Sequence, residues 1–172
     1  MFKNRYDVVV VGGGHSGVEA ALISSYLGVS VSLVTMDKNA IARMSCNPAI
    51  GGLAKGQIVR EIDVLGGLMA ETADVSGLQF KTLNKSKGRA VWSPRAQIDK
   101  RVYEKNVLKK IENSRISIIQ SEATSVDIRN YKVKSVSLRS GEKIKCSCLI
   151  ITAGTFLSGL IHIGERKILA GR

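Results

Sequence analysis

Residues that build metal centres and disulfide networks are scarce in this chain. Its 172 residues include three cysteines, two histidines and only two prolines. Three cysteines cannot all pair with one another, and Cys146 and Cys148 are spaced wrongly for a structural zinc knuckle. The sequence therefore predicts no metal site, and reduced thiols in a cytoplasmic protein are the simplest interpretation.

Long apolar runs are also missing. No stretch approaches the roughly 20 apolar residues that span a bilayer, and residues 8–11 are too short an apolar segment for a signal peptide. With 44% hydrophobic and 23% charged residues, the composition is typical of a soluble globular protein. We expect one domain over residues 1–172 and no membrane association.

Acidic residues are fewer than basic residues, and the formal net charge is +12. Residues 81–115 hold eleven Lys or Arg against three acids, which gives this segment a charge of +8. Clustered positive charge attracts polyanions, because neutralised phosphates release condensed counterions. A solvated basic helix without a partner explains the charge equally well at this stage.

The first 35 residues have the pattern of a βαβ unit. Tyr6–Val11 is the β-branched run of a buried strand, and a glycine turn follows it directly. A helix is expected at 18–27, ended by Gly28, with a second strand at 30–35.

The glycine turn matches the fingerprint G-x-G-x-x-G. Gly12 permits the tight turn, Gly14 lets the backbone approach a pyrophosphate, and Gly17 lets helix and strand pack closely. The phosphates would lie at the helix N-terminus, where free N–H groups and the helix dipole favour an anion. A purely structural glycine turn is the alternative. The predicted cofactor-binding residues are Gly12, Gly13, Gly14, His15, Ser16 and Gly17.

The identity of the dinucleotide depends on two further positions. An acid usually ends the second strand and binds the ribose, but here Thr35 stands there, so Thr35 or backbone groups would substitute. Residues 148–155 resemble the second sequence mark of two-dinucleotide-binding flavoproteins, a buried strand ending in a turn, here at Ala153 and Gly154. The small residues let the chain pass close to a cofactor, and together the two marks favour FAD over NAD.

The rest of the chain completes an α/β fold. We predict a Rossmann-like FAD-binding domain of the two-dinucleotide-binding type, with a parallel sheet and an antiparallel β-meander. Helices are expected from the N-cap pair Asn47-Pro48 to Gly66 and over 95–112, with an irregular basic stretch at 79–93 between them. Strands are expected at 117–120, 126–128, 132–138, 143–148 and 148–152.

Cys46 is a candidate nucleophile or redox thiol. If a helix begins at Pro48, its positive end would stabilise a thiolate at Cys46. A small buried residue that closes the loop is the alternative. The chain holds no Cys-x4-Cys pair, which excludes the dithiol of a disulfide reductase.

Residues 88–101 combine arginines with Trp92. Guanidinium groups bind phosphate through paired N–H donors, and an indole ring can stack on a base or simply cover the core. The segment is therefore a candidate for nucleic-acid contact.

Taken together, these segments resemble the GidA/MnmG family, flavin-dependent enzymes that modify the wobble uridine of tRNA. The resemblance covers essentially the whole chain, and its most specific mark is Cys46–Gly52. Its other marks are residues 12–17, 44–52, 59–69, 93–99 and 161–164.

The resemblance implies FAD as cofactor, NADH as reductant, methylenetetrahydrofolate as one-carbon donor, and carboxymethylaminomethyl or aminomethyl addition at carbon 5 of uridine 34. It implies a cytoplasmic homodimer that forms a heterotetramer with the GTPase MnmE. Thr124 would contact the adenine end of FAD through its main chain, and Cys46 would take part in chemistry on the uracil. The implied tRNA-binding residues are Lys85, Lys87, Arg89, Arg95, Lys100 and Arg101.

Two departures limit the resemblance. The family pattern Gly-Pro-Ala-Val is Gly88-Arg-Ala-Val91 here. Family members are also several times longer, so this chain would be an N-terminal portion without the nicotinamide-binding and helical C-terminal domains, inactive by itself. The alternatives are a flavin-dependent oxidoreductase on a small metabolite, a folate-dependent tRNA uracil methyltransferase, and a non-catalytic binding module.

Overall fold

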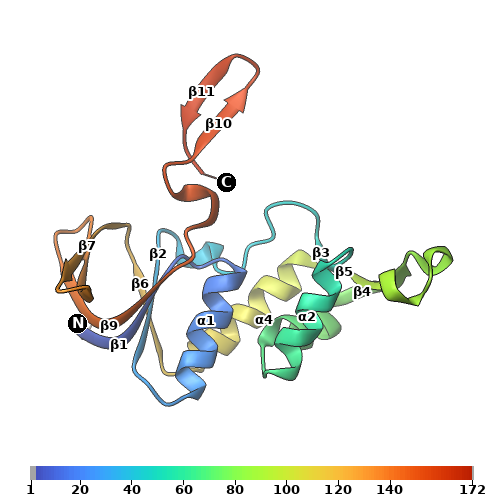
Figure 1. The fold of residues 1–172 in the computed structure, drawn as a ribbon, viewed down its shortest axis with the longest axis horizontal. Helices are drawn as coiled ribbons and strands as arrows, with labels where there is room; N and C mark the ends of the chain where they lie inside the picture. Colours follow the sequence, from blue (N-terminus) through green and yellow to red (C-terminus); the bar gives the residue numbers. More distant parts are fainter. Residues whose placement is uncertain (1–2, 172) are drawn as a thin grey trace.

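The computed structural model describes residues 3–171 and is built around one six-stranded sheet (Figure 1). Its strands are β1 (Arg5–Val11), β2 (Val31–Thr35), β6 (Ile116–Gln120), β7 (Ala123–Arg129), β8 (Lys132–Leu138) and β9 (Lys143–Ile151). The spatial order is β6-β2-β1-β9-β8-β7, with the first four strands parallel and β8 and β7 added antiparallel. The predicted parallel sheet with an antiparallel meander is confirmed.

Four helices accompany the sheet. Within residues 3–171 the α-helices are α1 (His15–Tyr26), α2 (Lys55–Val64), α3 (Leu68–Ser76) and α4 (Lys100–Glu112). Neighbouring residues of β1 point to opposite faces, as strand geometry requires. Val10 packs in a core with residues of α1, α3 and α4, whereas Val9 packs in a second core with Val136 and Ile144 of the meander. The central strands are thus buried on both faces.

A second, antiparallel sheet lies beside the helices. It consists of β3 (Ala49–Gly51), β5 (Ser93–Ile98) and β4 (Gly77–Leu83), in that order. Two short 3-10 helices, η2 (Lys85–Lys87) and η3 (Arg89–Val91), connect β4 to β5. A separate hairpin of β10 (Leu160–Ile163) and β11 (Arg166–Leu169) projects from the body of the molecule (Figure 1).

Near this second sheet, some of the elements predicted from the sequence were wrong. The helix expected at Pro48 begins at Lys55, and β3 occupies the residues between. The stretch expected to be irregular, residues 79–93, holds most of β4, and the helix expected from Arg95 begins at Lys100. The reason is tertiary pairing: β5 has partners on both edges, which outweighs the local helical pattern of its sequence.

Other differences concern boundaries and missed elements. The two strands expected at 143–148 and 148–152 form the single strand β9, which pairs antiparallel to β8 and parallel to β1. Helix α3 was not expected. Asp99 follows β5 and is the N-cap of α4, because its carboxylate accepts the N–H groups of Arg101 at 2.9 Å and Val102 at 3.1 Å. No helix within residues 3–171 is long and apolar enough to cross a membrane.

Candidate functional site

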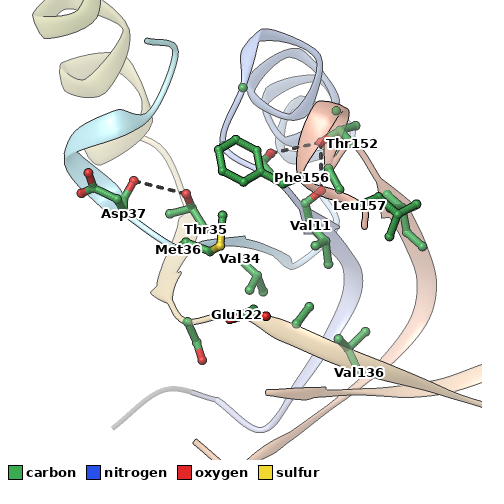
Figure 2. A pocket seen from close by; sticks show the side chains of 18 of the residues that line it. Val11, Val34, Thr35, Met36, Asp37, Glu122, Val136, Thr152, Phe156 and Leu157 are labelled. Atoms are coloured by element: carbon green, nitrogen blue, oxygen red, sulfur yellow. Dashed lines mark hydrogen bonds between the residues drawn. The ribbon is translucent and has the colours of Figure 1, made fainter. Parts of the chain in front are cut away.

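A cavity of about 580 Å³ opens at the carboxyl ends of β1, β2 and β9. Parallel α/β sheets bind ligands at this edge. Figure 2 shows Thr35 and Asp37 on one side of the cavity and Thr152, Phe156 and Leu157 on the other. The cavity brings together seven of the predicted cofactor-binding residues: Gly12, Gly13, Gly14, Thr35, Thr124, Ala153 and Gly154.

The start of the turn is fixed by close backbone contacts. Gly12 has φ +111°, and a Cβ there would collide with the carbonyl oxygen of Thr152. The Thr152 hydroxyl donates to the carbonyls of Val11 at 3.0 Å and Gly12 at 3.1 Å, while its N–H donates to Val11 at 2.8 Å. The β9 end is therefore locked to the β1 end, where both line the cavity.

The end of the turn forms the N-terminus of α1. A Cβ on Gly17 would collide with the carbonyl of Gly12, so Gly17 allows the helix to pack against the strand end. Gly14 is the N-cap, and a Cβ there would meet no atom within 4 Å. The backbone at Gly14 therefore faces open space beside the positive end of α1, which suits a phosphate.

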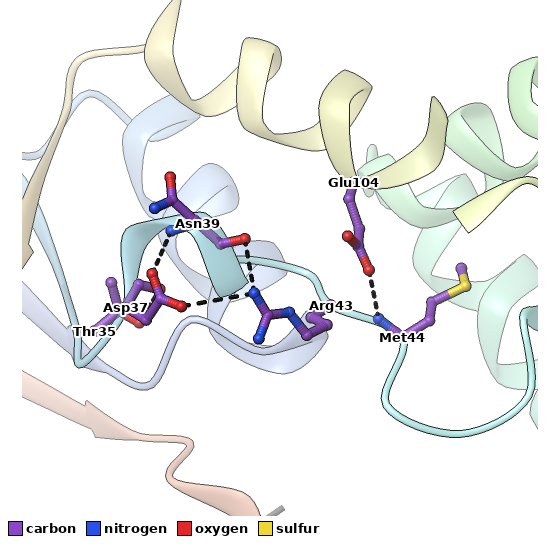
Figure 3. A network of polar contacts seen from close by, with 6 residues as sticks. All are labelled: Thr35, Asp37, Asn39, Arg43, Met44 and Glu104. Atoms are coloured by element: carbon purple, nitrogen blue, oxygen red, sulfur yellow. Dashed lines mark hydrogen bonds and ion pairs between the residues drawn. The ribbon is translucent and has the colours of Figure 1, made fainter. Parts of the chain in front are cut away.

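The side of the cavity at β2 carries polar groups. The Thr35 hydroxyl donates to the Asp37 carbonyl at 3.2 Å, and the Asp37 carboxylate accepts the Asn39 N–H at 2.8 Å, beginning η1 (Lys38–Ala40). Arg43 lies 3.6 Å from the second Asp37 oxygen and donates to the Asn39 carbonyl at 3.3 Å (Figure 3). Asp37 thus keeps acceptor capacity at the position where a ribose would be bound.

His15, Ser16 and Gly17 are not among the residues that line the cavity, although His15 begins α1. The His15 ring packs against Tyr103 of α4, with ring centroids 5.7 Å apart. Burial lowers the pKa of His15, opposed in part by the charge of Glu104. Burial also raises the pKa of Tyr103. Both side chains therefore favour their neutral forms.

Cys46 is exposed and lies outside the cavity lining, next to Ser45, which does line it. The expectation that Cys46 precedes a helix N-terminus was wrong, since residues 49–51 form β3 and α2 begins at Lys55. The helix-dipole argument for a thiolate at Cys46 therefore has no support in this fold.

The predicted tRNA-binding residues fall into two groups. Lys85, Lys87 and Arg89 are exposed in the loop between β4 and β5, and Arg95 follows in β5. Lys100 and Arg101 lie in the first turn of α4. None of the six lines the cavity.

The likeness to known proteins extends over the whole chain. Residues 7–172 match the family model described as glucose inhibited division protein A (GIDA). The chain belongs to this family. It is 51% identical, over 100% of its length, to the tRNA uridine 5-carboxymethylaminomethyl modification enzyme MnmG of Sulfurihydrogenibium sp. (strain YO3AOP1). Its identity to the protein of the same name from Endomicrobium trichonymphae is 47%, over 99% of the chain.

Solved structures agree with the GIDA assignment. Aquifex aeolicus GidA in its form I crystal superposes with a TM-score of 0.93 at 46% identity, covering 98% of this chain. The GidA-related protein from Thermus thermophilus has a TM-score of 0.64 at 18% identity over 97% of this chain and 61% of that one, a likeness of fold alone. The chain spans 28% of the length of the Sulfurihydrogenibium and Aquifex relatives and 29% of the Endomicrobium relative.

Several cavity residues of this GIDA-family chain carry no signal in the sequence. Arg43 and Ser45 come from the connection after η1, and Phe156 and Leu157 come from the turn at η4 (Gly154–Phe156) and just after it. Thr152 directly precedes the predicted Ala-Gly turn, so its place at the cavity is the one that the sequence could have indicated.

Proposed function

We propose that this chain is the FAD-binding part of an enzyme that modifies the wobble uridine of tRNA. The observation that carries the proposal is the match of residues 7–172 to the GIDA family, whose curated relatives are named for this modification. The proposed reaction adds a carboxymethylaminomethyl or aminomethyl group at carbon 5 of uridine 34. It uses NADH, methylenetetrahydrofolate and the GTPase MnmE in the cytoplasm, with the enzyme acting as a homodimer.

The cavity suits the ADP half of FAD. The backbone of Gly13 and Gly14 and the first amides of α1 would hold the pyrophosphate, because no Cβ fills the space at Gly14. Thr35 and Asp37 would accept ribose hydroxyls, and the backbone at Thr124 would meet the adenine. Bound FAD would supply two-electron redox chemistry, while these residues bind and orient its ADP end.

The basic residues would hold the tRNA substrate. Lys85, Lys87 and Arg89 are exposed on one loop, and Arg95, Lys100 and Arg101 continue the positive charge along β5 and α4. Cys46, exposed beside the cavity residue Ser45, remains the proposed participant in the chemistry on uracil.

Mass spectrometry of tRNA nucleosides tests the proposal. Deletion of the gene should leave uridine 34 without its carbon 5 substituent, and a plasmid copy should restore it. The Gly14→Val variant should fail to restore it, whereas Gly14→Ala should restore it in part. A normal nucleoside profile in the deletion strain would contradict the proposed function.

Substituting Cys46 by serine tests that residue separately. Loss of modification with flavin content unchanged would support a chemical role for the thiol. Full activity of Cys46→Ser would show that the thiol takes no part in the chemistry.

A further inference from the structure

The segment from β4 to β5, residues 77–98, is named the basic arm here. It carries five cations, Lys81, Lys85, Lys87, Arg89 and Arg95, and it contains neither Asp nor Glu. Elsewhere in residues 3–171, cations such as Arg43, Lys110, Arg129 and Arg139 form ion pairs, but none of the five does. The charge of the arm is thus not neutralised within the described chain.

The tip of the arm, residues 84–92 between β4 and β5, also presents an aromatic face. Trp92 is 40% exposed, and its indole N–H donates to the Lys85 carbonyl at 3.2 Å. The Arg89 guanidinium lies 5.8 Å from the centre of the indole ring. Phe80 of β4 is 58% exposed. Aromatic surface therefore lies next to unpaired cations.

Hydrogen bonds fold the tip into turns, so it is not an extended loop. The N–H of Lys87 donates to the Asn84 carbonyl at 2.9 Å, and the N–H of Trp92 donates to the Arg89 carbonyl at 3.2 Å. Gln57 of α2 donates to the Trp92 carbonyl at 3.3 Å, which joins the tip to the body. Figure 1 shows the loop projecting at the end of the molecule opposite β7, a strand whose first residues line the cavity.

We propose that the tip of the basic arm binds an unpaired stretch of RNA, with a base stacked on Trp92 beside Arg89 and with phosphates at Lys85 and Lys87. The proposal rests on the tRNA substrate of the proposed function and names the part of such a molecule that this surface recognises. In a duplex the base faces are already stacked on one another, so an exposed indole gains nothing from them. Unpaired bases offer free faces, and stacking with neighbouring cations is how sequence-tolerant single-strand sites work.

The chain has one tryptophan, so its fluorescence reports on this position alone. Titration with an RNA hairpin that has an unpaired loop should quench Trp92, and a blunt duplex of equal length should not. Equal quenching by hairpin and duplex, or quenching by polyglutamate, would overturn the proposal.

Variants separate stacking from charge. In anisotropy titrations with labelled hairpin, Trp92→Leu should weaken binding about 5- to 150-fold, and Trp92→Phe should recover part of the loss. The double variant Lys85→Gln/Lys87→Gln should lower the slope of log K against log salt by about 1.4, because single strands lose about 0.7 per phosphate contact. The matched control Lys132→Gln/Lys134→Gln removes the same charge from β8 and should leave the slope unchanged.

Failure of this proposal is distinguishable from failure of the proposed function. If the hairpin binds but the arm variants bind it as tightly as the parent, the arm assignment is wrong and a tRNA role stands. If Trp92→Leu weakens hairpin binding in the anisotropy titration while uridine 34 is normal in the deletion strain, the arm binds RNA and the modification proposal is wrong. Unchanged thermal unfolding of Trp92→Phe and of both lysine double variants confirms that losses arise at the surface.

Discussion

Gly12, Gly14 and Gly17 lie within one turn, and a methyl group would meet different surroundings at each. At Gly12 and Gly17 it would collide with the backbone of the protein, whereas at Gly14 it would point into open space. Gly14 also has an ordinary φ of −71°. The first and last glycines are therefore required by the fold, and the middle one is required only by what binds in front of it.

A side chain at Gly14 should consequently affect the cofactor and spare the fold. We expect Gly14→Val to weaken FAD binding at least about tenfold, a loss of roughly 1.4 kcal/mol, by filling the phosphate site. Urea unfolding of the FAD-free protein should change by no more than about 1 kcal/mol, because valine is a poorer N-cap than glycine but meets no atom of the fold. Flavin fluorescence titration measures the first quantity. Stoichiometric flavin retained by Gly14→Val would show that the pyrophosphate lies elsewhere.

His15 should make stability depend on pH. Burial lowers its pKa in the folded state below the ordinary value of 6.5. As pH falls through 6.5 the unfolded chain takes up the proton first, so the free energy of unfolding decreases until the lower folded pKa is passed. Urea unfolding at pH 7.5 and 5.5 should show this loss, and His15→Phe should reduce it. His162 is exposed, so His162→Gln should keep the parent's dependence.

At the scale of elements, α1 is the helix on which the site depends. Its N-terminus faces the cavity, and Glu19 in its second turn reaches α3. The Glu19 carboxylate accepts the N–H groups of Leu68 at 3.0 Å and Met69 at 2.7 Å, which are the opening amides of α3. Glu19 thus caps a helix about 50 residues away in the sequence and fixes it against α1.

Removing this cap should destabilise the fold without touching the cavity. We expect Glu19→Ala to lower the free energy of unfolding by about 1–3 kcal/mol, because two partly buried N–H groups lose their acceptor. Glu19→Gln keeps one amide oxygen and should lose less. Chemical denaturation measures both. Equal stability of Glu19→Ala and the parent would show that the α1–α3 contact contributes nothing.

The contact between α1 and β1 makes a second prediction at this scale. Gly17→Ala places a methyl group against the Gly12 carbonyl and the Thr152 hydroxyl, so it should cost about 1–3 kcal/mol of stability through overpacking. Gly14→Ala is the matched control in the same turn, with open space around the new methyl group. The same loss in both variants would mean that the close approach at Gly17 does not decide the outcome.

At the scale of the whole molecule, the cavity joins segments that are distant in the sequence. Residues from the turns after β1, β2 and β9 and from the start of β7 meet at one edge of the sheet. A ligand that contacts all of them holds the parallel strands and the meander together, and it should stabilise the folded state by mass action.

FAD should therefore raise the unfolding temperature of the chain. At 100 times its Kd it adds about 2.7 kcal/mol, which corresponds to a shift of roughly 5–11 °C for a domain of this size. FMN lacks the AMP portion of FAD, and so the pyrophosphate, ribose and adenine, and should produce no shift at the same concentration. Thermal unfolding with each flavin measures the difference, and an equal shift with FMN would refute ADP recognition by this cavity.

The elements with uninterrupted local patterns were predictable from the sequence. The valine run of β1, the glycine turn and the helix that follows it specify a βαβ unit through contacts close in the chain. The alternation at residues 132–138 and 143–148 specifies the antiparallel meander in the same way. For these segments the side-chain period matches the final environment.

The tertiary structure alone decided the rest. Asn47-Pro48 has the signature of a helix start, yet residues 49–51 pair with β5, and the helical pattern from Arg95 yields to the two strands on either side of it. By itself the sequence determined the glycine turn and the family, because those depend on residue identity at short spacing. Only the fold decided that Cys46 precedes no helix, that Asp37 and Arg43 border the cavity, and that Trp92 stands on an exposed basic arm, since these depend on partners distant in the chain.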